Sequence, residues 1–393
     1  MNSDPSIFSQ LISFAPRYEF NRCVKRFAGS LQPRKFSYWD QFLTMAFAQL
    51  TLRESLRDIE VCLAALGSKT YSMGFRSRVT RSTLADANDQ RDCRIWSDFA
   101  YLLIAEALKL YVKEVLEIEF GDAMYAIDSS TISLCLSLCP WARFRSGKGA
   151  IKLHTQLDLR GNIPSFILIS QGKMNDVNFL DDIVIEAGAM YVMDRGYFDF
   201  ARLFCFASNG AFFVTRLKKN IPYRRTKIFY RDKHTPIRCD ALITPLSRKA
   251  RNHYPLPLRL VEYFDLETNK KLVFITNNLL LSAQSIADIY KARWQIELFF
   301  KWIKQHLRIK TFFGTSQNAV TTQIWIAVSV YLLLAIAKKK LNLEHSLYTM
   351  LQVFSISSGE KMPILQAFSH PLDQELLDRR DNQLNLFDIP TGH

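Results

Sequence analysis

Tyr290-Lys-Ala-Arg293-Trp-Gln-Ile-Glu297-Leu-Phe-Phe-Lys-Trp-Ile-Lys304 is the stretch on which the interpretation of this chain depends. Its apolar residues recur at helical spacing, which predicts one amphipathic helix over residues 287–307. Four polar residues stand at offsets of 0, 3, 7 and 14 along this helix: Tyr290, Arg293, Glu297 and Lys304. At 3.6 residues per turn these offsets return to nearly the same side. We therefore expect one helix face to carry a phenol, a guanidinium, a carboxylate and an amine.

This set of side chains has two interpretations. Arginine binds a phosphate bidentately and lysine binds one as a point charge, whereas Glu297 would repel phosphate unless a cation lay between them. A divalent metal would explain its presence. In the other interpretation the face is solvated and the glutamate only pairs with a neighbouring lysine or arginine, which contributes about 0.3–0.5 kcal/mol. The spacing alone leaves both interpretations open.

Length and composition restrict the classes of protein that the chain could belong to. With 393 residues, of which 48% are hydrophobic, it can build two or three domains. The formal net charge of +14 favours a polyanionic partner, nucleic acid before an anionic membrane. The seven cysteines include no CxxC pair, which indicates buried thiols in a reducing cytoplasm. We expect no signal peptide, and we expect the apolar run at 324–337 to be a buried core helix because it is too short to span a bilayer.

Residues 1–118 are predicted to form a helical DNA-binding domain, with helices at 8–14, 38–50 and 56–66. Ser37 can cap the second of these. A further helix is expected to begin after Thr80 or Ser82, with a basic rim formed by Arg76, Arg78 and Arg81. A short helix, a turn and a basic-rimmed helix are what a helix-turn-helix needs. An ordinary helical bundle with a solvated basic rim is the alternative.

After residue 118 the pattern changes to short apolar strands. Segment 124–127 runs into Asp128 and segment 190–193 runs into Asp194. Strands are also predicted at 151–159 and 165–170, followed by a helix around 178–187. An aspartate after a strand is often only a turn former or a helix cap. Three converging carboxylates would repel one another unless divalent cations neutralised them, so Asp128, Asp194 and Glu297 together favour a metal site.

These motifs resemble the DDE transposases of the insertion-sequence-four family. The matching residues are Asp128 in Ala-Ile-Asp-Ser-Ser-Thr, Asp194 in Met-Asp-Arg-Gly-Tyr and the Tyr-Arg-Glu-Lys (YREK) signature that ends at Lys304. The resemblance implies an α/β, ribonuclease-H-like catalytic domain over residues 119–340. In it, Asp128 would lie on the first strand, Asp194 on the fourth and Glu297 on a later helix. The resemblance also implies a β-rich insertion, here at about 212–280.

The predicted insertion is strongly basic. Between Arg216 and Arg259 there are thirteen lysines and arginines but only two acidic residues. Such a balance favours neutralisation of DNA phosphates over a merely solubilising loop, which is the alternative. The insertion contains no tryptophan to stack on a flipped base, so an aromatic residue such as Tyr223, Phe229, Tyr230 or Tyr254 would have to serve. Candidate DNA contacts are Lys218, Lys219, Arg224 and Arg225.

The family resemblance also implies the chemistry. Asp128, Asp194 and Glu297 would be the catalytic residues and would hold two Mg²⁺ ions, for which Mn²⁺ could substitute. Tyr290, Arg293 and Lys304 would position DNA phosphates. The expected enzyme binds the terminal repeats of its element and cleaves and transfers DNA strands in cut-and-paste transposition. A metal-dependent nuclease without strand transfer and an inactive DNA-binding regulator are the alternatives.

The remaining expectations concern partners and location. We expect double-stranded DNA, both transposon end and target, as the partner of a homodimer that works in the bacterial cytoplasm at the nucleoid, without a membrane. Residues 341–393 are predicted to form a helical segment followed by a polar tail. A short motif in this tail resembles peptides that bind the DNA polymerase sliding clamp: Gln383, Leu384, Leu386 and Phe387. Packing of a tail helix against the body of the protein is the alternative.

Overall fold

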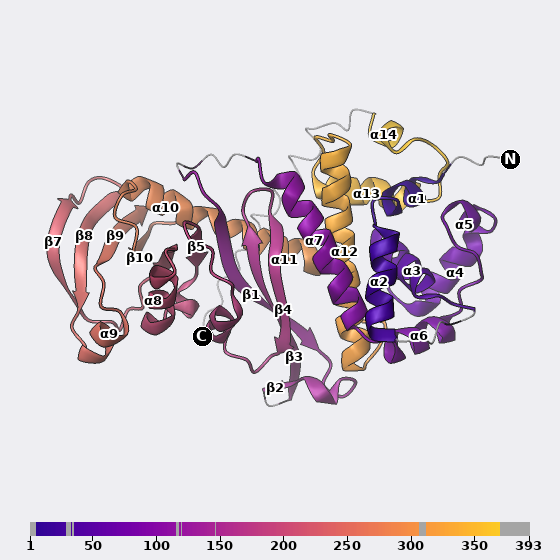
Figure 1. The fold of residues 1–393 in the computed structure, drawn as a ribbon, viewed down its shortest axis with the longest axis horizontal. Coiled ribbons are helices and arrows are strands. Elements are labelled where there is room, and N and C mark those ends of the chain that lie inside the picture. The colour runs from indigo at the N-terminus through magenta and orange to yellow at the C-terminus, as the bar shows by residue number, and fades with distance from the viewer. Residues whose placement is uncertain are drawn as a thin grey trace.

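One mixed sheet connects the parts of the molecule. The computed structural model describes residues 5–28, 33, 35–114, 118, 120–145, 147–305 and 312–369. Within these residues ten strands form the sheet (Figure 1). The strands are β1 (Met124–Leu134), β2 (Arg143–Arg145), β3 (Lys148–Asp158), β4 (Ile163–Gln171), β5 (Met190–Met193), β6 (Phe212–Arg216), β7 (Tyr223–Arg231), β8 (Ile237–Pro245), β9 (Leu258–Asp265) and β10 (Lys270–Thr276).

The pairing of the strands joins the predicted insertion to the rest of the sheet. Strand β1 pairs antiparallel with β3 and parallel with β5, and β5 pairs parallel with β6. From β6 the sheet continues antiparallel through β10, β9 and β8 to β7, which forms its edge. The insertion is therefore β-rich, as predicted, and its strands extend the same sheet to the left end of the molecule in Figure 1.

Helices precede, interrupt and follow the strands. The first group is α1 (Ile7–Ile12), α2 (Arg17–Ala28), α3 (Tyr38–Leu50), α4 (Leu56–Leu66), α5 (Lys69–Ser72), α6 (Arg81–Gln90) and α7 (Arg94–Tyr111). The others are α8 (Phe200–Ser208), α9 (Arg248–His253), α10 (Ala283–Ala292), α11 (Trp294–Gln305), α12 (Gln317–Lys340), α13 (Leu347–Ser357) and α14 (Ile364–Ala367), with 3₁₀ turns η1 (Pro140–Ala142), η2 (Asp176–Asp182) and η3 (Arg195–Tyr197). The predicted helices at 38–50 and 56–66 are confirmed, and Ser37 caps α3 in a capping box with Asp40.

Helix α12 lies among the N-terminal helices, with α7 between it and the sheet (Figure 1), and it contacts α7, α3 and α6. Among the residues that the structure describes, it is the one helix that is long and apolar enough to cross a membrane, but 94% of its most apolar window is buried inside the protein. It is therefore the core helix that the apolar run predicted. The N-terminal and C-terminal parts also meet, because the Ile7 N–H donates to the Glu360 carbonyl at 2.9 Å.

Alternation along the strands divides the buried side chains between the two faces of the sheet. Ala126 and Ile132 of β1 pack with α7, α11 and α12, whereas Ile127 packs on the opposite face with η2 and α8. Residues two apart share a face, so Asp128 lies on the α11 face and Ser129 on the η2 face. This division decides what each polar residue of β1 can contact.

The predicted helix at 178–187 is wrong. The chain forms the 3₁₀ turn η2 from Asp176 to Asp182 and then continues without helix to β5. Asn175 caps this turn through a hydrogen bond from the Val177 N–H to its side chain. The local sequence Asn-Asp-Val-Asn is rich in short polar side chains that bond to nearby backbone, and these favour turns over a helix interior.

Candidate active site

The two predicted aspartates lie at the same level of neighbouring parallel strands. Ile127 of β1 pairs with Met193 of β5, which makes Asp128 and Asp194 the next two residues in register. Adjacent strands lie about 4.8 Å apart, so the two carboxylates are neighbours. The prediction that Asp128 ends its strand is wrong, because it is the fifth residue of an eleven-residue strand. Pairing with β3 continues β1 past Asp128, while pairing with β5 stops there.

The third carboxylate, that of Glu297, comes from the second of two consecutive helices, α10 and α11. Instead of the single helix predicted over 287–307, α10 ends at Ala292 and α11 begins at Trp294. Arg293 stands at the joint, where the Arg293 N–H donates to the Tyr290 carbonyl and the Ile296 N–H donates to the Arg293 carbonyl. These are 3₁₀-type bonds, which tighten the chain locally. Glu297 consequently lies in the first turn of a new helix.

Arg293 joins the carboxylates of the two elements. Its Nη1 lies 3.0 Å from Asp128 Oδ2, and its Nη2 lies 2.5 Å from Glu297 Oε1. The Tyr290 hydroxyl donates to Asp194 Oδ1 at 3.2 Å. The structure therefore brings together Tyr290, Arg293 and the three acidic residues. Lys304 lies in the last turn of α11, about 10 Å farther along the helix axis than Glu297.

Burial and crowding alter the acidity of the cluster. Burial raises the pKa of Asp128 to about 6, and the neighbouring Glu297 and Asp194 carboxylates act in the same direction against the opposing Arg293. Burial also raises the pKa of Tyr290 to about 12, so this hydroxyl stays protonated at neutral pH. The Arg293 Nε is buried without a hydrogen-bond partner. Three partly buried carboxylates thus face one guanidinium within this cluster.

The chemistry of the donors suits a hard divalent cation. Three carboxylates supply only oxygen ligands, and the raised pKa of Asp128 means that added positive charge would stabilise its ionised form. Among the described residues no three or more His, Cys, Asp or Glu side chains are yet arranged to hold an ion. The guanidinium of Arg293 lies between two of the candidate ligands instead.

The comparison with known families decides what this cluster belongs to. A model of the transposase DDE domain matches residues 119–333, more than half of the chain. This chain belongs to the DDE transposase family. It is therefore an enzyme that cleaves and transfers DNA strands, and enzymes of this family generally depend on divalent metal ions. A second match, to a domain of unknown function (DUF4372), covers residues 3–76.

Three relatives of the transposase are also named as transposases. The y4zB protein of Sinorhizobium fredii is 35% identical over 263 residues, which are 65% of this chain and 71% of the relative. The protein of insertion sequence element IS5377 of Geobacillus stearothermophilus is 30% identical over 55% of this chain and 57% of its own. The protein of element IS4SA of Synechocystis is 26% identical over 64% and 70%.

The transposase has a second polar cluster that the sequence did not reveal. On the face of β1 opposite to Asp128, the Ser129 hydroxyl donates to Asp176 Oδ1 at 2.6 Å. Lys152 of β3 donates to the same oxygen at 2.9 Å and to the Met174 carbonyl at 2.8 Å. Burial opposes ionisation of Asp176, but the hydrogen bonds from Lys152 and Ser129 outweigh it and lower its pKa. The cluster ties η2 to both strands directly behind Asp128.

The N-terminal part of the transposase differs from the predicted helix-turn-helix. Residues 67–80, which include α5, separate α4 from α6, and this connection is longer than the three or four residues of such a turn. Thr80, one of the two predicted capping residues, caps α6. Arg81, the first residue of α6, is exposed. Arg76 stacks on Tyr71, with the guanidinium 4.2 Å from the ring centre. Arg78 lies 4.0 Å from Glu60 and is otherwise largely exposed.

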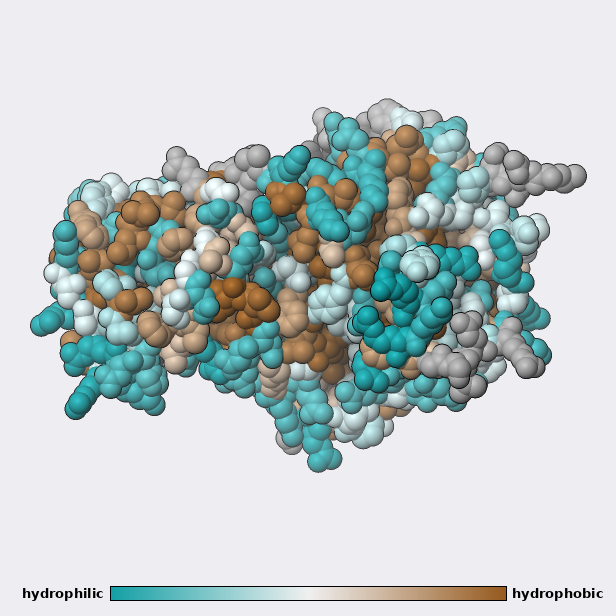
Figure 2. Space-filling view, viewed as in Figure 1, coloured by the Kyte–Doolittle hydropathy of each residue, from teal (hydrophilic) through white to brown (hydrophobic). Residues whose placement is uncertain are grey.

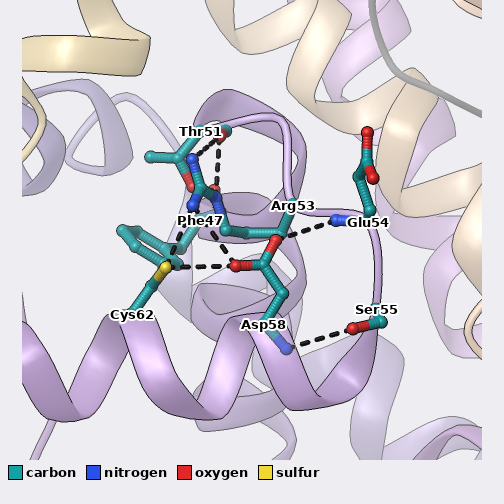
Figure 3. Close-up of polar contacts among 7 residues, drawn as sticks. All are labelled: Phe47, Thr51, Arg53, Glu54, Ser55, Asp58 and Cys62. Carbon is teal, nitrogen blue, oxygen red and sulfur yellow. Dashed lines mark hydrogen bonds and ion pairs between the residues drawn. The ribbon is translucent and has the colours of Figure 1, made fainter.

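A hydrogen-bonded turn fixes α4 against α3 (Figure 3). Arg53 Nη1 contacts Cys62 Sγ at 2.9 Å and Asp58 Oδ1 at 3.4 Å, and the Glu54 N–H donates to Asp58 Oδ2 at 3.0 Å. Arg53 also donates to the Thr51 carbonyl. These contacts close the turn between the helices, so α4 is held at a set position beside α6.

Some basic residues of the insertion are exposed, whereas others form hydrogen bonds or ion pairs within the protein. Arg224 and Lys219 are exposed, whereas Lys218 donates to the Phe198 carbonyl at 2.9 Å and Arg225 pairs with Glu262 at 2.6 Å. Arg259 is buried in an ion pair, so it is not a surface base.

The prediction that Tyr254 could stack on a base is wrong, because this residue is buried, with 1% exposure. Phe229 and Tyr230 remain accessible on β7, at 50% and 41% exposure. The sliding-clamp motif at 383–387 lies outside the described residues.

Proposed function

We propose that this transposase mobilises an insertion sequence by binding the terminal repeats and then cutting and joining DNA strands in a cut-and-paste reaction. The observation that carries the proposal is the convergence of Asp128, Asp194 and Glu297 from two strands and a helix. Nothing in the fold requires three partly buried carboxylates to lie together, and their mutual repulsion has an electrostatic cost. Binding of catalytic divalent cations would explain why the three carboxylates lie together despite this cost.

We also propose that the transposase is a member of the insertion-sequence-four family and that its catalytic domain, residues 119–340, is ribonuclease-H-like. Antiparallel pairing of β4, β3 and β1, followed by parallel pairing of β1, β5 and β6, supports this assignment. Asp128 on β1, Asp194 directly after β5 and Glu297 on α11 support the same assignment, since β5 is the fourth strand of the domain when the three-residue β2 is left out. The YREK signature is shared between α10, the joint at Arg293 and α11.

Asp128 and Asp194 would hold one Mg²⁺ and Asp128 and Glu297 a second, with Mn²⁺ as a substitute. When bound, such ions activate a water or a 3′ hydroxyl and stabilise the leaving oxygen. The residues of the chain have separate roles. Tyr290, protonated at neutral pH, orients Asp194 through its hydroxyl, and Arg293 exchanges carboxylate contacts for the phosphate next to the scissile bond. Lys304, farther along α11, binds a phosphate outside the cleavage site.

Double-stranded DNA is held by two further regions in this proposal. Arg76, Arg78 and Arg81 of the helical N-terminal domain, residues 1–118, contact the terminal repeat. Lys218, Lys219, Arg224 and Arg225 of the insertion contact DNA phosphates. The transposase acts as a homodimer on DNA in the bacterial cytoplasm, at the nucleoid. The C-terminal segment, residues 341–393, recruits the polymerase sliding clamp through Gln383, Leu384, Leu386 and Phe387.

The test is strand cleavage and joining on DNA that carries the ends of the element, with Mg²⁺. We expect wild type to cut and join, and Glu297→Gln to bind the same DNA with neither activity. Glu344→Gln, an exposed residue far along the chain, is the matched control and should retain both activities. Cutting without joining would indicate a nuclease instead. Tight binding without chemistry in wild type would indicate a regulator.

A further inference from the structure

A short hairpin next to the catalytic strand carries unpaired positive charge that no site described above uses. Strand β2 and the start of β3 form it, and we call the set Arg143, Arg145 and Lys148 the basic arm. All three side chains are exposed, and among the residues that the structure describes no ion pair holds them. Residues 132–157 contain no aspartate or glutamate. Hydrophilic side chains project at the lower edge of Figure 2, where Figure 1 places this hairpin.

The pairing register places Arg143 of the basic arm on the same face of the sheet as Asp128, whereas Lys148, next to Gly149, and its partner Arg145 belong to the opposite face at the end of the hairpin. Arg143 pairs with Gly149, and Gly149 pairs with Leu134 of β1, so these residues share a face. Asp128 precedes Leu134 by six residues, an even number, and therefore points to this face too. At about 3.3 Å per residue the arm begins about 20 Å from Asp128, which is the length of about six base pairs.

Contacts with neighbouring segments hold the hairpin in place. Phe144, between the two arginines, packs so closely on Gly172 that a Cβ at residue 172 would lie 2.8 Å from the ring. The Trp141 indole donates to the Thr315 carbonyl at 2.8 Å, which fastens η1 to the segment before α12. The Arg145 guanidinium lies 4.9 Å from the centre of the Phe144 ring. The charges are thus presented from a supported hairpin and lose little freedom on binding.

We propose that the basic arm binds the sugar-phosphate backbone of duplex DNA about six base pairs from the scissile bond. The proposal rests on the proposed function, because it takes Asp128 as the position of the cut. Charge complementarity identifies the occupant: three exposed cations in a stretch without acidic residues, of which Arg143 lies on the face of the catalytic carboxylate, match the phosphates of a duplex that leaves the site. The arm binds phosphates and not bases, so its binding does not depend on the DNA sequence.

The experiment compares Arg143→Gln/Arg145→Gln/Lys148→Gln with wild type on a 60-base-pair duplex that carries one element end and its flanking DNA. Each phosphate contact contributes about 0.9 to the slope of log affinity against log salt concentration. We expect the slope to fall by about two to three and backbone protection to disappear five to seven base pairs from the cut. Thermal unfolding should be unchanged, because the three side chains are exposed.

Two further variants make the result specific. Lys25→Gln/Lys109→Gln/Lys361→Gln removes the same charge from exposed positions on other elements and should leave slope and footprint as in wild type. Arg143→Lys/Arg145→Lys/Lys148→Arg keeps the charge and should restore both.

A wild-type slope and footprint in the arm variant, or an equal loss in the control set, would overturn the proposal. If wild type does not cut the duplex, the proposed function fails, whereas the effect of the arm on the salt slope is still measured.

Discussion

Arg293 Nη1 lies 3.0 Å from Asp128 Oδ2, although the two residues are 165 positions apart in the chain. The same guanidinium reaches Glu297, so one positive charge lies between two of the three carboxylates. Tyr290, Asp128 and Glu297 act to raise the pKa of Arg293 and outweigh the burial that would lower it. Arg293 therefore stays charged and reduces the repulsion among the acidic side chains.

Removing this charge should increase the affinity of the site for a metal ion. With Arg293→Gln, two partly buried carboxylates lose their nearby cation, and we expect Mn²⁺ to bind the DNA-free protein at least about tenfold more tightly, a change of about 1.4 kcal/mol. Electron paramagnetic resonance of free Mn²⁺ measures the affinity. Arg202→Gln, which removes an arginine paired with Asp181 outside the site, is the control and should change nothing. Unchanged or weaker Mn²⁺ binding by Arg293→Gln would contradict the role assigned to this guanidinium.

The raised pKa of Asp128 makes its effect on stability depend on pH. A carboxyl with a pKa near 6 in the folded protein and near 4 in the unfolded chain favours folding below about pH 4, and this contribution is lost as pH rises through 6. Relative to wild type, Asp128→Asn should thus be more stable at pH 8 than at pH 4, by up to about 3 kcal/mol. Denaturant unfolding in metal-free buffer at both pH values checks this. A pH-independent difference would show that Asp128 does not titrate as described.

The Asp176 cluster should matter for stability, because Lys152 is mostly buried. Asp176→Asn removes the negative charge beside the Lys152 ammonium, which is then left with neutral acceptors such as the Met174 carbonyl. We expect a loss of about 1–2 kcal/mol in the free energy of unfolding, reduced from the value for a buried pair because Asp176 is partly exposed. Adding Lys152→Met should recover most of it. Asp181→Asn, in an exposed pair, should cost less than about 1 kcal/mol, and an equal loss in both variants would refute the prediction.

Arg259 should act in folding and not in DNA binding. It donates to both Asp240 oxygens, at 2.8 and 2.7 Å, and both side chains are at most 10% exposed. Arg259→Met should therefore destabilise the protein by about 3–5 kcal/mol, and Asp240→Leu in addition should restore most of the loss. The salt slope of DNA binding by the folded fraction should stay as in wild type, in contrast to Arg224→Gln. A lower slope in folded Arg259→Met would place Arg259 at the DNA.

Local signals predicted much of the secondary structure. Ser37 and Thr80 mark helix starts because their side chains satisfy free backbone N–H groups of the first turn. The strand at 190–193 was also predicted with its observed bounds, because a short apolar run that ends at an aspartate is typical of a buried strand. At 178–187 a helix was predicted, whereas short polar side chains favour the 3₁₀ turn that the chain forms over Asp176–Asp182.

The sequence by itself determined which residue types could form the site, since Asp128, Asp194 and Glu297 each follow from a motif and its spacing. Only the tertiary structure decided that Arg293 stands at a helix joint between two of them, and that Ser129 turns away from Asp128 toward Asp176 and Lys152. The basic arm was likewise invisible in the sequence, because its position depends on the register of β1 with β3. Spacing along a chain fixes the side of one helix or strand, whereas contacts between elements arise from strand pairing and packing over long separations.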